Sequence, residues 1–580
     1  MAAFCSAALR VPPGPPLLAM SVDGWPLYLA LALVGLAALL AACWHWPILF
    51  LHGWPIRLFC RLFYPVRAIG VENVPLKGPA LLVCNHVSYL DWVVVLAACP
   101  RYVRWVIFAS WLRRFGLGHF VRRGRVIAID AWGGPKSIRG SLTAAAEALA
   151  AGDVVGIFAE ARFTRTGHLL PFHRGLERIL EQYPAPVIPV YLDGLWGSVW
   201  SFFGGKLFWK WPRRFRPRAL VAFGKPLPPD TPAPVVRQAV QKLGADCSAE
   251  RARTALPVHR QFVRRAARHP FRPCMYDSTL DMHLSYARTL AAAWGLATLL
   301  RPVLGDEPMV GVWLPSSAGG AITNIALALL GKAAVNLNYT APADAVRSAV
   351  RQCGIRHVLT SQRFLDPKPL DLGGSGAELV VLDQYKPRFT LWMRLSRFLA
   401  AVLLPGWVLD RWLLGLGGHT TADLATVIFS SGSTGEPKGV MLTHANVAAN
   451  AASVLDVVEV TARDRLLGIL PFFHSFGYTV TLWVPLVAGA SLVYHADPRQ
   501  AKKIGELCRK HRCTIFLATP TFLRFCLRQC DPADFATLRL LICGAEKLPQ
   551  PLACDFHRKF GVLPLEGYGC TETSPVAATN

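Results

Sequence analysis

A short loop rich in glycine and hydroxyl residues, near residue 430, constrains the fold of this chain more than any other feature. Ala425–Phe429 is a β-branched and aromatic run that predicts a strand, and a second β-type run begins at Val440. Between them, residues 430–439 read SSGSTGEPKG. Glycines let consecutive backbone N–H groups surround a polyphosphate, hydroxyl groups add donors, and lysine adds positive charge. A flexible linker would not be framed by two strands, and the spacing differs from the G-x-x-x-x-G-K-S/T pattern, so we expect an α/β domain with a phosphate-binding loop.

Length and composition bound the remaining possibilities. With 580 residues, the chain has room for about two to four domains. Hydrophobic residues make up 53% and charged residues 17%, which excludes disorder as the main state. The 62 Lys and Arg against 36 Asp and Glu give a net charge of +26, which favours an anionic partner such as nucleic acid, an acidic membrane or a phosphorylated substrate. The 15 cysteines include no C-x-x-C pair, so no zinc ribbon or disulfide framework is predicted and a reducing compartment is expected.

One segment near the amino terminus is free of charge. No Lys, Arg, Asp or Glu occurs from Trp25 to Ile56, and residues 25–51 are long enough to form a helix that crosses a hydrocarbon core of about 30 Å. We therefore expect a leader at 1–24 and a membrane-anchoring helix at 25–51. Arginines follow the segment before any acid, so the positive-inside rule places everything after it on the cytoplasmic side of the inner (cytoplasmic) membrane. A buried hairpin of a soluble core, or a re-entrant or interfacial helix, would also fit.

Three basic stretches without acidic residues lie further along the chain, at 101–125, 206–225 and 251–272. Their lysines and arginines are interleaved with Trp, Phe and Leu, which is typical of a surface lying on an anionic membrane. A surface with this pattern could also bind RNA. No RRM, KH, zinc-finger or helix-turn-helix signature accompanies it, so we expect no nucleic-acid partner. Prolines on both sides of the third stretch indicate a basic linker at 231–272.

A second chemical pattern begins with the apolar run Leu81–Val83, which predicts a buried strand. The residues after it read CNHVSYLD and predict the start of a helix. His86 would lie at the end of the strand, and Asp91 in the first helical turn. An aspartate there can accept the N–H of one ring nitrogen and leave the other nitrogen free as a general base. Because the chain has 16 histidines, an ordinary strand–helix corner is the alternative.

This block resembles the glycerolipid acyltransferases, which move an acyl chain from a thioester to a glycerophosphate hydroxyl. The resemblance implies that His86 deprotonates the hydroxyl and that Asp91 orients the imidazole. Residues 156–162, GIFAEAR, stand where that family has F-P-E-G. Glu160 and Arg162 would then hold the phosphate and hydroxyls of the acceptor, since arginine suits bidentate phosphate binding.

The V-I-P-V strand motif of that family recurs at 187–190, but two alanines depart from the family pattern. Ala159 replaces the proline and Ala161 the glycine of F-P-E-G. If the glycine position needs a positive φ, alanine costs about 1 kcal/mol there. A fold that has lost its activity is therefore a second alternative.

The loop near residue 430 resembles the phosphate loop of the acyl-adenylate-forming enzymes. Three further motifs of that family follow in order: LPFFHSFG at 470–477, CGAEKL at 543–548 and EGYGCTE at 566–572. The resemblance implies ATP and Mg²⁺ as cofactors, with His474 beside the acyl pocket and Glu572 as the Mg²⁺ ligand. The residues that it assigns to ATP are Ser431, Gly432, Ser433, Thr434, Gly435, Lys438, Gly544, Ala545, Glu546, Tyr568, Gly569 and Thr571.

The order of the two units resembles the bacterial bifunctional acyl-[acyl carrier protein] synthetases and 2-acylglycerophosphoethanolamine acyltransferases. The resemblance implies an acyltransferase domain at 57–230 and an AMP-binding adenylation domain at 273–580. A fatty acid would react with ATP to give an acyl-adenylate. The phosphopantetheine thiol of acyl carrier protein, or coenzyme A, would then take the acyl group, and the first domain would pass it to a lysophospholipid.

Only the large N-terminal subdomain of the adenylation fold is recognisable before the chain ends at Asn580, so we expect the ligase reaction to be impaired. One alternative is that the acyltransferase alone is active, as a 1-acylglycerol-3-phosphate-type enzyme. The other is a non-catalytic, membrane-bound fragment that binds nucleotide or lipid. The apolar and basic segment at 388–416 matches none of these motifs.

Overall fold

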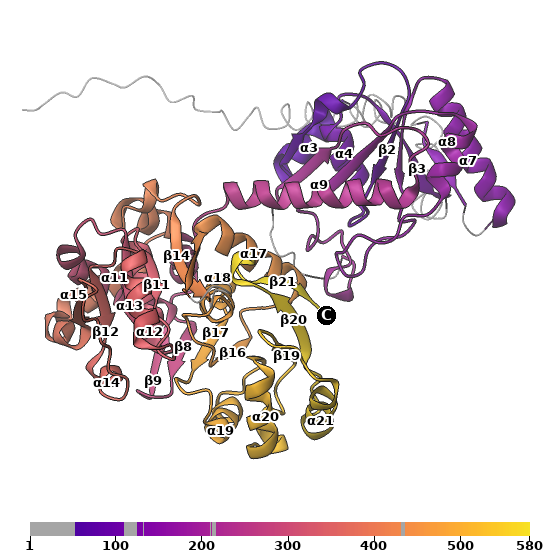
Figure 1. Ribbon diagram of the computed structural model, residues 1–580. Coiled ribbons are helices and arrows are strands. Elements are labelled where there is room, and N and C mark those ends of the chain that lie inside the picture. Colours follow the sequence, from indigo (N-terminus) through magenta and orange to yellow (C-terminus); the bar gives the residue numbers. More distant parts are fainter. Residues whose placement is uncertain (1–52, 110–124, 131–132, 209, 211–215, 431–435) are drawn as a thin grey trace, which may run out of the picture. The chain divides into compact units, whose positions relative to one another are not determined.

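The computed structural model describes residues 53–580 apart from 110–124, 131–132, 209, 211–215 and 431–435 (Figure 1). The chain forms two compact units, which divide after Cys247. Both units are α/β, as the sequence predicted.

The amino-terminal unit is built on a seven-stranded sheet with the order β1-β7-β6-β2-β5-β3-β4. Neighbouring strands are parallel except for β6 and β7, which are antiparallel. The strands are β1 (Val66–Ile69), β2 (Ala80–Cys84), β3 (Val103–Phe108), β4 (Ile127–Ile129), β5 (Val154–Phe158), β6 (Val187–Asp193) and β7 (Ala219–Phe223). The helices are α3 (Trp54–Phe63), α4 (Asp91–Ala98), α7 (Gly134–Ala150), α8 (Gly175–Gln182) and α9 (Ala233–Thr254), with short turns η2 (Val71–Asn73) and η3 (Phe203–Gly205).

β2 lies in the interior of this sheet, and its sequence explains why. All five residues of Ala80–Cys84 are apolar and fully buried, as expected of a strand that is covered on both faces. Alternate side chains enter different cores: Leu82 packs in one apolar cluster, and Leu81 and Val83 pack in another. The carboxyl end of β2 is therefore a rigid platform for the residues that follow it.

The carboxyl-terminal unit contains two sheets, a six-stranded one with the order β13-β12-β10-β11-β14-β15 and an eight-stranded one with the order β21-β20-β19-β18-β16-β17-β8-β9. The strands of the first are β10 (Met309–Trp313), β11 (Ala333–Asn336), β12 (His357–Thr360), β13 (Glu378–Val381), β14 (Leu424–Ser430) and β15 (Lys438–Thr443). Those of the second are β8 (Pro273–Asp277), β9 (Met282–Ser285), β16 (Arg465–Gly468), β17 (Ser491–Tyr494), β18 (Ile515–Ala518), β19 (Leu540–Cys543), β20 (Leu565–Gly569) and β21 (Val576–Thr579).

Helices connect and cover these sheets, and one large apolar core contains residues of α11, α12 and both sheets. The helices are α10 (Val258–Arg268), α11 (Tyr286–Leu304), α12 (Ala318–Leu329), α13 (Ala343–Gln352), α14 (Gln362–Leu365), α15 (Leu391–Leu403), α16 (Gly406–Val408), α17 (His444–Val457), α18 (Val484–Ala488), α19 (Ala501–His511), α20 (Pro520–Gln529) and α21 (Gln550–Phe560). Short helical segments are η4 (Leu382–Arg388), η5 (Leu409–Leu413), η6 (Leu416–Gly418), η7 (Phe476–Trp483), η8 (Pro532–Phe535) and η9 (Thr571–Thr573).

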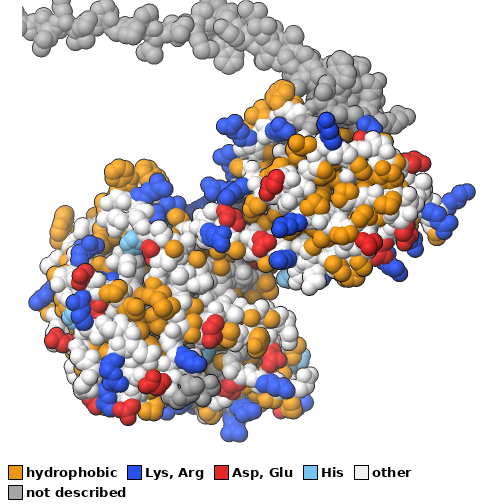
Figure 2. All heavy atoms as spheres, turned by 45° about the horizontal axis from the view of Figure 1, so that its top comes forward, with side chains coloured by type: hydrophobic (Ala, Val, Ile, Leu, Met, Phe, Trp, Pro, Cys, Tyr) orange, Lys and Arg blue, Asp and Glu red, His pale blue; other side chains and the backbone are white. Residues whose placement is uncertain are grey.

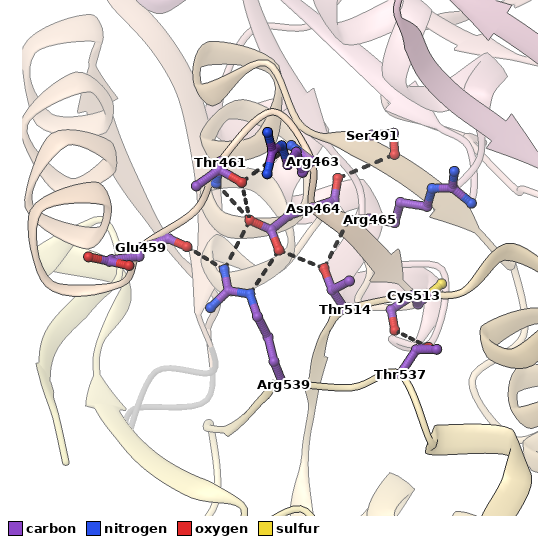
Figure 3. A network of polar contacts seen from close by, with 10 residues as sticks. All are labelled: Glu459, Thr461, Arg463, Asp464, Arg465, Ser491, Cys513, Thr514, Thr537 and Arg539. Atoms are coloured by element: carbon purple, nitrogen blue, oxygen red, sulfur yellow. Dashed lines mark hydrogen bonds and ion pairs between the residues drawn. The ribbon is translucent and has the colours of Figure 1, made fainter. Parts of the chain in front are cut away.

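A buried carboxylate ties the amino ends of three neighbouring strands of the larger sheet (Figure 3). Asp464 precedes β16, Thr514 precedes β18 and Arg539 precedes β19. Asp464 Oδ1 accepts from Arg539 Nε at 2.9 Å and from Thr514 Oγ1 at 2.7 Å, and Oδ2 accepts from Arg539 Nη2 at 2.9 Å. The amino ends of these three strands are thereby tied together.

The predicted linker at 231–272 is largely helical, and its second half belongs to the carboxyl-terminal unit. In α10, Val258, Phe262 and Val263 are fully buried in the main core of that unit. Arg260, one of the basic residues of the predicted linker, is itself buried and bridges Asp410 at 2.6 Å. The second domain therefore begins before residue 273.

The membrane anchor that we expected is not supported. Among the residues that the structure describes, no helix is both long and apolar enough to cross a bilayer. The longest of them, α9, has 22 residues but carries charges along its length, among them Arg237, Lys242 and Asp246. The leader at 1–24 and the expected helix at 25–51 lie outside the described residues.

Candidate functional site

His86 and Asp91 come together at the carboxyl end of β2. His86 Nδ1 lies 2.8 Å from Asp91 Oδ2. The same carboxylate oxygen accepts the backbone N–H groups of Val87 at 2.8 Å and Ser88 at 2.9 Å. The side chain of Asp91 is fully buried, whereas that of His86 keeps 12% of its surface exposed. Nδ1 is therefore engaged, while no described residue makes a hydrogen bond to Nε2, which leaves that nitrogen for a substrate.

Burial and hydrogen bonding act on the Asp91 carboxylate in opposite directions. Burial raises the pKa of Asp91, and the hydrogen bonds from His86, Ser88 and Val87 oppose that rise. A buried carboxylate gains most from a nearby cation, because the interior screens charge weakly. Asp91 can therefore stabilise positive charge that develops on the ring beside it during a reaction.

Glu160 holds the same corner through its backbone contacts. Oε1 accepts the N–H of His86 at 2.9 Å and Oε2 accepts the N–H of Leu170 at 3.1 Å. Burial raises the pKa of Glu160 to about 7, although these N–H groups act in the opposite direction. Thr164 N donates to the His86 carbonyl at 3.0 Å, so the loop after β5 is bound to His86 from both sides. The expected contact of Glu160 with the acceptor's phosphate stays a prediction.

Two phenylalanines enclose the imidazole ring, and the sequence analysis did not identify either of them. The ring centroid of Phe158 lies 3.9 Å from that of His86 with an interplanar angle of 12°, and that of Phe163 lies 3.8 Å away. Tyr89 packs against Phe163 at 4.2 Å. The place of Phe158 as the last residue of β5, two before Glu160, is the signal that could have revealed it. The sandwich fixes the plane of the imidazole and keeps water from its faces.

His86 borders a cavity of about 990 Å³. Much of its lining is apolar and comes from the strands and helices around β5: Trp92, Val106, Ile107, Phe108, Ile129, Leu142, Ile157, Leu176 and Ile179. Arg162, Arg165 and His173 supply polar groups to the same cavity. Pockets of this size and character bind small, largely apolar ligands. The place of Arg162 fits its expected contact with a phosphate, which also stays a prediction.

Of the two alanines that depart from the family pattern, only Ala161 has a positive φ. Ala161 has a φ of 53°, in the left-handed region. This position does need a positive φ, so alanine in place of glycine costs about 1 kcal/mol here.

A β-hairpin brackets the predicted phosphate loop. β14 and β15 pair antiparallel, with Ser430 opposite Lys438. Lys438 is exposed at the first position of β15. Ser431–Gly435, which were assigned to ATP, lie outside the described residues. The pairing returns the chain so that Lys438 stands beside the start of the loop, where its charge can reach a polyphosphate.

The other three motifs meet at the carboxyl edge of the eight-stranded sheet. Gly544 follows β19, Tyr568 lies near the end of the neighbouring parallel strand β20, and His474 lies in the loop after β16. A β-carbon on Gly544 would stand 3.1 Å from the ring of Phe476, so the His474 loop and the Gly544 loop are in contact. Ligands of α/β proteins bind in this position, at the carboxyl ends of parallel strands.

Close backbone approaches explain several small residues of these motifs. A β-carbon on Gly477 would lie 2.0 Å from the Pro471 carbonyl oxygen, and one on Gly569 would lie 2.0 Å from that of Pro575. Ala545 has a φ of 68°, which turns the chain sharply after Gly544. Glu546 Oε2 accepts from Thr521 Oγ1 at 2.8 Å, which ties the Gly544 loop to α20.

The last motif lies against the hairpin. η9 is in contact with β15, and Asn450 of α17 donates to the carbonyl oxygens of Thr573 at 3.1 Å and Val576 at 2.8 Å. Asn450 was not identified from the sequence, because a single asparagine on a helix carries no motif. Tyr568 is 72% exposed, and Glu572 is also exposed. Both groups face solvent, where a nucleotide can reach them.

The donor set fits ATP with Mg²⁺. Lys438 supplies positive charge, Tyr568 an aromatic face and Thr571 a hydroxyl. The described residues contain no cluster of three or more His, Cys, Asp or Glu that could hold a metal ion. Mg²⁺ does not require one, because it is commonly bound by one or two carboxylates together with substrate phosphates, and Glu572 is the carboxylate available here.

Two family descriptions match the chain. Residues 262–580 match AMP-binding enzyme, and residues 65–193 match acyltransferase. The chain belongs to the AMP-binding enzyme family. It fuses an acyltransferase domain to the acyl-adenylate-forming domain of that family.

Similar proteins include ligases that act on carboxylic acids. The long-chain-fatty-acid–CoA ligase of Bacillus subtilis (strain 168) is 34% identical over 166 residues, which are 27% of this chain and 29% of the ligase. The 4-coumarate–CoA ligase 1 of Oryza sativa subsp. japonica is 26% identical over 331 residues, which are 55% of this chain and 58% of that protein. The chain thus spans less than two thirds of the length of these relatives. A solved structure, a benzoate CoA ligase from Burkholderia xenovorans LB400, is 20% identical with a TM-score of 0.47, covering 56% of this chain and 63% of that one.

Proposed function

We propose that the protein transfers an acyl chain from a thioester to the free hydroxyl of a lysophospholipid, and that its AMP-binding domain activates free fatty acids with ATP. The observation that carries the first half is the His86–Asp91 pair at the border of a largely apolar cavity. The cavity suits an acyl chain, and Arg162 and Arg165 at the same cavity suit the phosphate of the acceptor.

The acyl transfer follows from the geometry of the pair. Nε2 of His86 takes the proton of the acceptor hydroxyl as its oxygen attacks the thioester carbonyl. Asp91 stabilises the imidazolium that results, and Phe158 and Phe163 hold its ring in place. The tetrahedral intermediate then expels the thiolate, which recovers the proton from Nε2. The products are a diacyl phospholipid and a free thiol.

In the second domain the carboxylate of a fatty acid attacks the α-phosphorus of ATP, and pyrophosphate leaves. A thiol then displaces AMP from the acyl-adenylate, and this gives the thioester that the first domain consumes. Phosphopantetheine of a carrier protein and coenzyme A are the two thiols that fit this chemistry. The net charge of +26 favours an acidic carrier protein.

The test of the first half is acyl transfer from a labelled acyl-carrier-protein thioester, and from the matching coenzyme A thioester, to lysophosphatidylethanolamine. We expect the full chain to form diacyl product and His86→Ala to lose about a hundredfold or more of the rate. His168→Ala is the matched control, because His168 is an exposed histidine of the same unit outside the cavity. Equal rates for the parent chain and His86→Ala would refute the assignment.

The test of the second half is pyrophosphate release that depends on fatty acid, in the presence of Mg²⁺ and ATP. Lys438→Ala should reduce this release while leaving acyl transfer from a preformed thioester unchanged. Loss of acyl transfer in Lys438→Ala would contradict the independence of the two chemistries.

A further inference from the structure

The segment from α15 to η5 takes no part in either candidate site. In the sequence it lies between β13 and β14, two strands of the six-stranded sheet that are not neighbours. α15 lies at the left of Figure 1. The segment makes up most of the apolar and basic stretch at 388–416, which matched no motif. Its two sides differ sharply in composition.

The inner side is seated firmly on the unit. Ala401 is fully buried, and Phe398 packs against the main core. The ring of Phe389 fills the space over Gly295 of α11, where a β-carbon would stand 2.6 Å from it. Asp410 of η5 is fully buried and is bridged by Arg260 at 2.6 Å and by Arg264 at 2.7 Å. The segment is therefore a fixed part of the fold.

The outer side of α15 is a stripe of exposed apolar side chains. At about 100° per residue, these positions fall within roughly 120° of the helix circumference. Their exposed fractions are 80% for Leu391, 75% for Trp392, 45% for Leu395, 42% for Leu399 and 72% for Leu403. The following residues add Trp407 at 56% and Trp412 at 76%. We call these seven residues the outer face. Soluble proteins rarely expose contiguous apolar surface of this kind without a partner.

The exposed charged residues from 384 to 422 are all basic. Arg388, Arg394 and Arg411 are exposed. Asp410 is the only acidic residue from 384 to 422, and its charge is buried and paired. Figure 2 shows hydrophobic side chains next to Lys and Arg, with Asp and Glu also present, on the visible face of the carboxyl-terminal unit.

We propose that the outer face lies on an anionic lipid surface. Tryptophan concentrates at the boundary between lipid and water, leucine enters the acyl region, and arginine pairs with anionic headgroups. A second copy of the chain fits less well, because a symmetric contact would bring the same three arginines together without an acid to pair them. This surface is separate from both catalytic sites, so the inference stands whether or not the proposed function holds.

This contact would hold the adenylation unit in a fixed orientation relative to the membrane. The helix would lie in the plane of the interface with its stripe buried, as surface-bound amphipathic helices do. Long-chain fatty acids and lysophospholipids reside in the same surface. The segment would therefore bring the unit to the phase in which apolar substrates are concentrated.

The test places the photo-crosslinking residue p-benzoylphenylalanine at position 392 or 403 of the full chain, and at position 563 as the control. Leu563 is also an exposed leucine, at 53%, on the loop before β20 of the same unit. The chain is irradiated with vesicles of equimolar phosphatidylcholine and phosphatidylglycerol. We expect phospholipid adducts at 392 and 403 and none at 563. Vesicles of phosphatidylcholine alone should give a much lower adduct yield.

The charge requirement is tested by R388Q/R394Q/R411Q in the chain labelled at 403. We expect the adduct yield to fall at least about tenfold, because each arginine near an anionic surface strengthens binding severalfold. R351Q/R363Q/R524Q removes three exposed arginines elsewhere on the same unit and should leave the yield unchanged. Crosslinks to a second copy of the chain in place of lipid would overturn the proposal. So would adducts at 563 equal to those at 392 and 403, or the absence of any lipid adduct.

Discussion

Asp91 Oδ2 lies 2.8 Å from His86 Nδ1 and also accepts the backbone N–H groups of the two residues after that histidine. One carboxylate oxygen thus fixes both the ring and the turn that carries it. Its position five residues after His86, at the first residue of α4, makes this possible within a single turn of chain.

We expect Asp91→Asn to lower the kcat of acyl transfer about a hundredfold or more, because the amide cannot stabilise the imidazolium. KM should change little, since Asp91 is fully buried and does not border the cavity. Steady-state kinetics of the acyl transfer measure both constants. Asp246→Asn alters an exposed carboxylate of the same unit and should match the parent. A raised KM with an unchanged kcat would place Asp91 in substrate binding instead.

Ala161→Gly should stabilise the amino-terminal unit by about 1 kcal/mol, because Ala161 has a φ of 53° and glycine adopts that region without strain. Denaturant unfolding of the parent and the variant measures the difference in the free energy of unfolding. Ala151→Gly is the control, because Ala151 has a φ of −74°, where glycine brings no relief. An equal response at the two positions would show that strain at Ala161 is absent.

The parts of the site that sequence predicted are those encoded by local spacing. His86 and Asp91 are five residues apart, and the strand before the phosphate loop is one apolar run. Phe158 and Phe163 were missed because a different strand, β5, brings them to His86. No local pattern distinguishes a phenylalanine that packs on the His86 ring from one in the core.

Long-range pairing also explains the error at the domain boundary. Arg260 was counted with a basic linker because its partner, Asp410, is 150 residues away in the sequence. Because Arg260 is paired inside the unit, α10 is a core helix, and its apolar residues form the buried face. The membrane anchor was inferred from an uncharged, apolar run that is long enough to cross a bilayer, but no helix among the described residues is both long and apolar enough to do so.

Gly569→Ala should destabilise the carboxyl-terminal unit by about 1 to 3 kcal/mol, because the new β-carbon would stand 2.0 Å from the Pro575 carbonyl oxygen and the backbone must move. Thermal unfolding of the full chain measures the loss. Gly417→Ala places the same methyl group in open space and should leave stability unchanged. A Gly569→Ala variant as stable as the parent would mean that the turn at 569–575 yields freely.

Tyr568→Ala should weaken ATP binding about tenfold or more without lowering thermal stability. The side chain is 72% exposed, so its removal leaves no cavity, whereas stacking of an aromatic ring on a base contributes about 1 to 3 kcal/mol. Titration calorimetry with Mg²⁺ and ATP measures the affinity. Leu563→Ala removes an exposed side chain just before the same strand and serves as the control. Unchanged affinity in Tyr568→Ala would separate Tyr568 from the nucleotide.

Three histidines inside the carboxyl-terminal unit make its stability depend on pH. His259 Nε2 lies 3.1 Å from His419 Nδ1, and the ring centroids of His259 and His444 are 4.6 Å apart. Burial lowers the pKa of His259 well below its ordinary value and that of His444 to about 4. Unfolded histidine titrates near pH 6.5, so the folded unit keeps these rings neutral where the unfolded chain would bind protons.

The sign of the effect follows directly. Above about pH 6.5 the histidines are neutral in both the folded and the unfolded chain, so the free energy of unfolding is at its full value. As the pH falls toward 4, that free energy decreases by about 1.4 kcal/mol per pH unit for each buried histidine. Unfolding free energies measured between pH 7 and pH 4 should show this slope. His444→Gln should flatten it by one histidine's share, whereas His557→Gln, an exposed histidine on α21, should not alter it. An identical slope in the His444→Gln variant would mean that His444 titrates alike in the folded and unfolded chain.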